Sequence, residues 1–246
     1  MARFARFLVW LTLCAALPGM QAWAVDFDQA AAAFKNKDYQ SALAAWRTLA
    51  KKGNAAAQYD LALMYAHGYG VAQNDALAVS WYKEAAKQGY AKAEHNLAVH
   101  LQHGRGVEQD YKAAARWYGK AAEQGLAPAQ NNLAMLYAQG LGVDKNLAKA
   151  AYWAAAAAQQ GNKAAIRNLN QMLKGKPQME VAGSNVNVRA EPGTNAEILM
   201  QSDEGARVVV LNSRDDWKQV LFDDDHQIGW IAGFLLRPAS ESAAKQ

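Results

Sequence analysis

The stretch NLAVHLQHGRGVEQDYKAAARWYGKAAEQG, residues 96–125, decides the fold because its pattern recurs on either side of it. Glycine, tryptophan and leucine residues each return at an interval of 36 residues. The recurring sets are Gly53, Gly89, Gly125 and Gly161; Gly68, Gly104 and Gly140; Gly70, Gly106 and Gly142; Trp81, Trp117 and Trp153; and Leu61, Leu97 and Leu133. So many positions at one period predict a repeat architecture.

Each repeat is predicted to form two helices. Asn74, Asp110 and Asn146 are placed to accept hydrogen bonds from the free N–H groups at the start of each second helix. The first helices are expected over residues 56–67, 92–103 and 128–139, each followed by a GxGV loop. One unit cannot bury its repeated Leu-Ala face alone, so neighbouring units must stack into an α-solenoid. The repeated tryptophans are expected in its core.

These residues resemble the Sel-1-like repeat, a relative of the tetratricopeptide repeat (TPR). Residues 57–71 and the sequence WYKEAAKQG of residues 81–89 match the family's pattern, and the resemblance covers about residues 55–165. Ala62, Ala98 and Ala134 depart from that pattern, because the family often has Gly there. The resemblance implies a TPR-like solenoid, which we place over residues 25–173, with a non-catalytic protein-binding surface.

Beyond a predicted linker at residues 174–180, the sequence alternates in the manner of β-strands. Strands are expected over 185–190, 198–201, 206–211, 217–222 and 228–232, which predicts a small all-β barrel. Asn187-Val188-Arg189 with Pro192, and Gly229-Trp230-Ile231, resemble the signatures of a bacterial SH3-like domain. We place this domain at residues 181–237, followed by a flexible tail at 238–246. The resemblance implies binding of cell-wall peptide or glycan, or of a protein.

The first 24 residues have the layout of a secretory signal peptide. Arg3 and Arg6 precede an uncharged run over residues 7–17, and Ala22-Trp23-Ala24 forms an A-x-A cleavage site. A retained membrane anchor is the alternative, but the run is much shorter than a spanning helix needs. We therefore expect export, to the periplasm of a bacterium, with cleavage after residue 24. Cleavage would remove the chain's single cysteine, Cys14.

Composition and motifs argue against several classes of function. The formal charge is +4, from 26 Lys and Arg against 22 Asp and Glu, which is too small and too evenly spread to indicate nucleic-acid binding. No G-x-S-x-G elbow, Cys-His pair or H-E-x-x-H motif occurs, so we expect neither catalytic residues nor a cofactor. His100 and His103 are spaced to share a metal, but no further ligands accompany them, so solvated or packed histidines are the better interpretation.

Two binding surfaces are candidates. On the first helices, three positions face away from the Leu-Ala packing face and vary between repeats, as expected for a concave protein-binding surface. These nine residues are Tyr59, Leu63, His67, His95, Val99, His103, Asn131, Met135 and Gln139. An ordinary solvated face is the alternative for this set. In the barrel the ligand candidates are Arg189, Trp217 and Trp230, although a place in the barrel core is the better interpretation of both tryptophans.

The sequence therefore predicts an exported, non-enzymatic adaptor. Its solenoid would bind a protein partner in the cell envelope, and its barrel would bind peptidoglycan or a second protein. One alternative is a β-lactam-binding or β-lactam-hydrolysing enzyme, because cysteine-rich relatives of this repeat are associated with that activity. Another is the targeting subunit of a wall hydrolase. We expect no nucleic-acid partner and no stable membrane span after signal cleavage.

Overall fold

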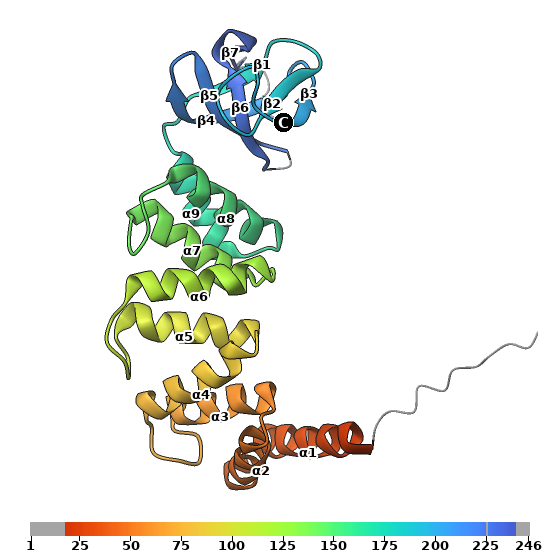
Figure 1. The fold of residues 1–246 in the computed structure, drawn as a ribbon, viewed down its shortest axis with the longest axis vertical. Coiled ribbons are helices and arrows are strands. Elements are labelled where there is room, and N and C mark those ends of the chain that lie inside the picture. The colour runs from red at the N-terminus through yellow and green to blue at the C-terminus, as the bar shows by residue number, and fades with distance from the viewer. Residues whose placement is uncertain (1–17, 225, 240–246) are drawn as a thin grey trace, which may run out of the picture.

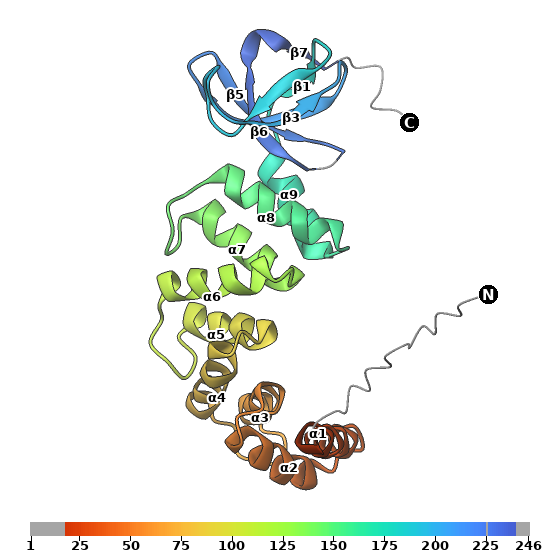
Figure 2. The same cartoon turned by 45° about the vertical axis from the view of Figure 1, so that its right-hand side comes forward.

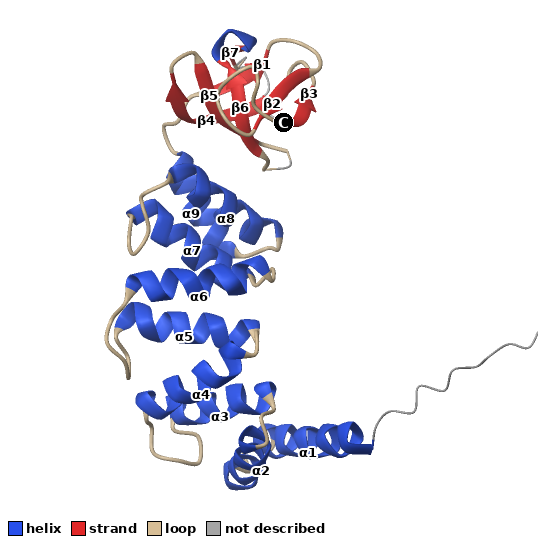
Figure 3. Cartoon of the chain, in the orientation of Figure 1, coloured by secondary structure: helices blue, strands red, loops and turns tan. Residues whose placement is uncertain are grey.

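The computed structural model describes residues 18–224 and 226–239, which form a column of helices followed by a β domain (Figures 1 and 3). Turned by 45°, the helical column follows a curved path with the β domain at its C-terminal end (Figure 2). The helices within the described ranges are α1 (Pro18–Lys35), α2 (Tyr39–Lys51), α3 (Ala55–His67), α4 (Asp75–Lys87), α5 (Ala91–His103), α6 (Tyr111–Glu123), α7 (Ala127–Gln139), α8 (Leu147–Gln159) and α9 (Lys163–Leu173). This solenoid confirms the predicted helical architecture.

Local capping sets the helix boundaries. The side chains of Asn74, Asp110 and Asn146 accept hydrogen bonds from backbone N–H groups at the starts of α4, α6 and α8, as predicted. The first helix of each repeat ends at a glycine in the left-handed conformation, which relieves the steric penalty that a side chain would meet there. Each predicted first helix therefore ends at its expected residue, and each begins within one residue of its expected start.

The second glycine of each GxG loop packs against the preceding repeat. A Cβ atom added to Gly106 would lie 2.3 Å from the backbone carbon of Asp75, at the start of α4. A Cβ atom added to Gly142 would lie equally close to the backbone carbon of Tyr111, at the start of α6. Only glycine allows this approach of two backbones, so the loops fix the spacing between repeats.

Small and large apolar side chains alternate in the solenoid core. Leu61 and Ala62 on α3 are fully buried, as are their equivalents in the next two repeats to within 3%. The predicted place of the tryptophans is only half right, because Trp81 is partly buried while Tyr82 beside it is 1% exposed. Periodicity shows which positions recur. The orientation of α4 about its axis decides that Tyr82 is more deeply buried than Trp81.

A ladder of polar side chains joins the two ends of each repeat and, at two of the boundaries, bonds to the preceding unit. Gln88 Nε2 donates to Gln58 Oε1 at 2.7 Å, and Gln160 Nε2 donates to Gln130 Oε1 at 2.8 Å. Gln58 and Gln130 also donate through Nε2 to the carbonyl oxygens at positions 50 and 122, both at 3.1 Å. In the middle repeat the carboxylate of Glu94 takes the place of the Gln58 and Gln130 amides. Gln124 Nε2 donates to Glu94 Oε2 at 2.8 Å.

The β domain is a single antiparallel sheet of seven strands that curls on itself in the manner of an SH3 domain, in the order β3-β2-β6-β5-β4-β1-β7. Its strands are β1 (Gln178–Val181), β2 (Val186–Arg189), β3 (Ile198–Ser202), β4 (Arg207–Arg214), β5 (Trp217–Phe222), β6 (Ile228–Ala232) and β7 (Leu236–Pro238). The five predicted strands are present. The sheet also includes β1, which lies mostly in the predicted linker, and β7, which pairs with it.

The two domains share an apolar contact. Leu211 on β4 and Leu221 on β5, which are 5% and 1% exposed, belong to the same buried cluster as Ala154 and Ala155 on α8. Leu169 on α9 joins this cluster. The β domain therefore covers the apolar end that the last repeat would otherwise leave open to water.

The N-terminal prediction lies partly outside the described residues. Residues 1–17 of the predicted signal peptide are not described, and α1 begins at Pro18 and continues through the predicted cleavage site. Phe27 and Phe34 of this helix contact the ring of Trp46 on α2. Within the described ranges, no helix is long and apolar enough to cross a bilayer.

Candidate functional site

The nine predicted residues of the solenoid lie on α3, α5 and α7, three on each helix. His67, His103 and Gln139, near the helix ends, are exposed, and the other six residues are partly buried. All nine remain at least partly open to solvent. The set is therefore a surface strip and not part of the fully buried core.

Hydrogen bonds hold the middle of this strip in place. His95 Nδ1 lies 3.1 Å from Asn96 Oδ1, and His95 Nε2 lies 3.2 Å from Asn132 Nδ2. An amide oxygen only accepts and an amide nitrogen only donates, so the imidazole is neutral with its proton on Nδ1. Burial lowers the pKa of His95, which agrees with that neutral form. Asn168 Nδ2 then donates to Asn131 Oδ1 at 2.8 Å, which ties α9 to α7.

Two residues of the strip line a pocket. His67 from α3 and Val99 from α5 border a cavity of about 340 Å³, together with the side chains of Tyr82, Asn96 and His100. The rings of Tyr82 and His100 lie 5.5 Å apart at their centroids, and both residues are almost fully buried. The structure thus brings part of the predicted set together around a pocket with a fixed aromatic and polar lining.

The β domain has a larger groove. Arg189 and Trp217 line a cavity of about 480 Å³ together with Asp216 and Phe234. The guanidinium of Arg189 donates to the Ala196 carbonyl at 2.6 Å, which holds this side chain at the groove wall. Two of the predicted barrel residues therefore share one groove.

A second cavity, of about 460 Å³, adjoins the groove. It shares Trp217 and Asp216 with it and is otherwise lined by Pro192, Glu191 and Arg214. Trp217 therefore contributes to both cavities. Because its ring is only partly buried, it is available to a ligand on either side.

The third barrel candidate takes a different role. Trp230 is 8% exposed and lines neither cavity, so it contributes to the core of the domain. Sequence reasoning missed Phe234, which is 82% exposed, the largest value among the exposed large apolar residues of the described chain. Its position in the short 3-10 turn Gly233–Leu235, directly after a buried strand, is a signal that could have identified it.

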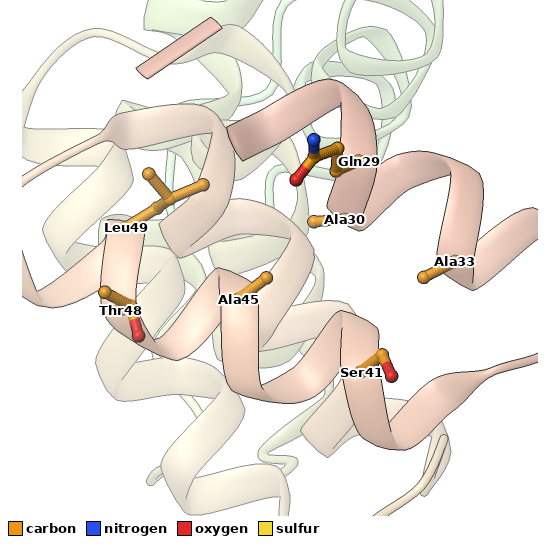
Figure 4. A pocket seen from close by; sticks show the side chains of 7 residues that line it. All are labelled: Gln29, Ala30, Ala33, Ser41, Ala45, Thr48 and Leu49. Carbon is orange, nitrogen blue, oxygen red and sulfur yellow. The ribbon is translucent and has the colours of Figure 1, made fainter. Parts of the chain in front are cut away.

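Another pocket of about 340 Å³ lies between α1 and α2, outside the predicted surfaces (Figure 4). Short side chains such as Ala30, Ala33 and Ala45 leave this groove open, and no charged side chain lines it. Within the residues the structure describes, no three His, Cys, Asp or Glu side chains are grouped in a way that would hold a metal ion.

Comparison with known proteins identifies both parts of the chain. The Sel1 repeat model matches residues 55–90, 91–126 and 127–162, and the bacterial SH3 domain model matches residues 184–236. The chain is therefore a Sel1 repeat protein with a C-terminal bacterial SH3 domain. A search among curated proteins finds no match.

Many solved structures are similar to this chain, among them two with 33% identity. A Sel1 repeat protein from Oxalobacter formigenes has 33% identity and a TM-score of 0.58, over 61% of this chain and 61% of that one. A protective antigen of uropathogenic Escherichia coli strains, which displays an SLR fold, has 33% identity and a TM-score of 0.60, over 63% of this chain and 35% of that one. The chain thus spans less than two thirds of the length of either protein.

Proposed function

We propose that this protein is an exported, non-enzymatic adaptor with two binding surfaces. The strip on α3, α5 and α7 binds a protein partner of the cell envelope, and the groove of the SH3 domain binds peptidoglycan. The observation that carries the proposal is the groove itself, where the predicted residues Arg189 and Trp217 meet the exposed ring of Phe234.

The groove has the chemistry that a wall peptide or glycan needs. The largely exposed ring of Phe234 offers an aromatic surface on which an apolar or ring-shaped part of a ligand can pack. The Trp217 ring offers an apolar face, while Asp216 and Arg189 offer an acceptor and donors that can fix a ligand's orientation. Its volume of about 480 Å³ falls within the range of small-ligand pockets.

The solenoid strip suits a protein segment for a different reason. Aromatic, apolar and amide side chains alternate along it, and their neighbours restrain several of them, so little side-chain entropy is lost on binding. Because both surfaces belong to one chain, engagement of the wall would raise the effective concentration of the solenoid near a wall-associated partner.

Co-sedimentation of the purified protein with peptidoglycan sacculi tests the groove. Wild-type protein should pellet with sacculi, and Phe234→Ala should reduce the pelleted fraction about tenfold, the change expected when one well-packed aromatic contact is lost. Leu199→Ala is the matched control, because Leu199 is 51% exposed on the same domain but lies outside the groove. Equal pelleting of Phe234→Ala and wild type would refute groove-mediated wall binding.

Export has its own test. The protein should be recovered from the periplasm of a Gram-negative host with Val25 as its first residue, as determined by N-terminal sequencing. Recovery of the chain with its first 24 residues attached, in the cytoplasmic fraction, would contradict this part of the proposal.

A further inference from the structure

The pocket at the junction of the first two Sel1 repeats is unusually polar. Besides His67 and His100, it is lined by Gln73 from the first GxGV loop region, by Asp75 at the start of α4 and by Arg105 from the second loop. Two segments that are separate in sequence, the first loop with the start of α4 and the second loop, thus contribute an amide, an anion and a cation to one cavity of about 340 Å³.

The next repeat shows that the fold does not require these polar groups. At the following junction the equivalent positions carry aromatic or apolar side chains: Tyr111 in place of Asp75, Leu136 in place of His100 and Leu141 in place of Arg105. Leu136 is 1% exposed, and Tyr111 and Leu141 pack against the same cluster. Packing alone therefore does not explain the polar set at the first junction.

Three of the polar side chains at the first junction also lack a hydrogen-bond or ion-pair partner among the residues that the structure describes. At the second junction, Gln109 Nε2 donates to the hydroxyl of Tyr111 at 3.2 Å and to the carbonyl of Gln102 at 2.8 Å. Across the described residues, neither a hydrogen bond nor an ion pair involves the side chains of Gln73, Asp75 or Arg105. Their hydrogen-bonding capacity remains available to a ligand.

Backbone contacts fix the relative position of the two residues that carry the charges, Asp75 and Arg105. Gly106 packs directly on the backbone of Asp75, so the preceding residue, Arg105, must lie beside the start of α4. His100 Nδ1 donates to the Arg105 carbonyl at 2.8 Å, which ties the loop to α5. Arg105 and Asp75 therefore line the pocket from adjacent backbone segments, and among the described residues they form no ion pair with each other.

We propose that this pocket binds the free C-terminal residue of a partner protein. Arg105 would receive the terminal carboxylate in the bidentate geometry that suits a guanidinium, and Asp75 would accept the backbone N–H of the last residue. Gln73 would supply a further donor to the carboxylate. The cavity volume matches one or two residues of peptide, and the pocket is continuous with the strip through His67 and Val99. This inference rests on the proposal that the solenoid binds a protein.

Side-chain NMR of the full protein tests this inference with three defined probes. They are N-acetyl-alanyl-alanine with a free carboxylate, its carboxamide, and N-acetyl-alanyl-glutamate carboxamide, which carries its carboxylate on a side chain. The free carboxylate should produce saturable shifts of the Arg105 Nε–H and Gln73 amide signals. The two carboxamides should bind at least about tenfold more weakly, because each lacks the terminal carboxylate.

Substitutions copied from the next repeat keep the test independent of folding. Arg105→Leu and Asp75→Tyr introduce the residues that the second junction already accommodates, so both variants should fold, and both should lose the Gln73 shift. Arg116→Leu, which removes an exposed arginine from α6, is the matched control and should keep it.

Each remaining outcome counts against the inference. Equal shifts with the carboxamide of alanyl-alanine would exclude carboxylate recognition, and equal shifts with the glutamate probe would assign the pocket to acidic side chains. A Gln73 shift that survives in Arg105→Leu would also overturn it. Peptides that bind the strip regardless of their carboxyl end would leave the adaptor function standing and refute only this pocket.

Discussion

The solenoid and the SH3 domain differ in how far apart in sequence their contacting elements lie. In the solenoid each helix packs mainly against the next one in the chain, from α1 to α9. In the SH3 domain β1 pairs with β7, so that Met179, near the start of the domain's sequence, lies opposite Pro238, near its end. Damage to one part of the solenoid should therefore remain local, whereas the SH3 domain should lose its structure as a unit.

The largest expected effect is at a glycine of the solenoid. Gly142→Ala would place a Cβ atom 2.3 Å from the backbone of Tyr111 in a residue with φ of 70°. Backbone displacement and the left-handed conformation together should cost about 3–5 kcal/mol of unfolding free energy. Urea denaturation followed by circular dichroism measures this loss.

Gly161→Ala is the control for that substitution. Its φ is 78°, but a Cβ atom there meets nothing within 4 Å, so only the conformational penalty of about 1 kcal/mol remains. If the two alanine variants lost equal stability, the account of GxG loops as contacts between repeats would be wrong.

The next effect tests the contact between the domains. Leu221→Ala should cost about 3 kcal/mol, because it removes a fully buried side chain from the cluster shared with α8. Val208→Ala removes a fully buried side chain from the SH3 domain's own core. Hydrogen exchange of α8 amides should accelerate in Leu221→Ala and stay near the wild-type rate in Val208→Ala. Unchanged α8 exchange in both variants would mean that the domains fold independently.

A smaller, pH-dependent effect is expected at Asp60. Burial raises the pKa of its carboxyl to about 6, while the next two repeats carry Asn96 and Asn132 at this position. A raised pKa stabilises the folded state at low pH, and this contribution is lost as the pH rises through about 6. Asp60→Asn should therefore gain about 1–2 kcal/mol at pH 7.5 and almost nothing at pH 4.

Thermal unfolding at those two pH values measures the gain. Asn96→Asp is the reciprocal variant, and it should lose stability at pH 7.5. A stability gap between Asp60→Asn and wild type that is the same at both pH values would rule out ionisation as its cause.

The smallest effect is expected in the polar ladder. Glu94 is 2% exposed, and burial raises the pKa of its carboxyl, while Gln58 and Gln130 fill the equivalent sites as amides. Glu94→Gln should therefore add a donor toward the carbonyl of Ala86 and stabilise the protein by about 0.5–1 kcal/mol at neutral pH. Gln130→Glu should remove the equivalent donor and lower the stability of the protein at neutral pH. A stability loss in Glu94→Gln, measured by urea denaturation, would contradict this interpretation.

The contrast between the domains also explains what the sequence could predict. The starts of the second helices are set by local signals, such as the Asn74 side chain that caps α4, so single residues are sufficient to locate them. β1 and β7 were missed because each is short and depends on a partner distant in sequence. Trp230 and Phe234 show the same limit in the SH3 domain, since strand and turn geometry decides that the first is buried and the second exposed.

The central claim is that one chain carries two independent binding surfaces. Selection of binders against the purified protein, from random linear peptides displayed on phage and from solubilised peptidoglycan fragments, tests it most directly. The account predicts two classes of binder that do not compete with each other. One class should be lost on Trp217→Ala with Phe234→Ala, and the other on His67→Ala with Val99→Ala. A single class of binders, or binders that both double variants retain, would contradict the claim.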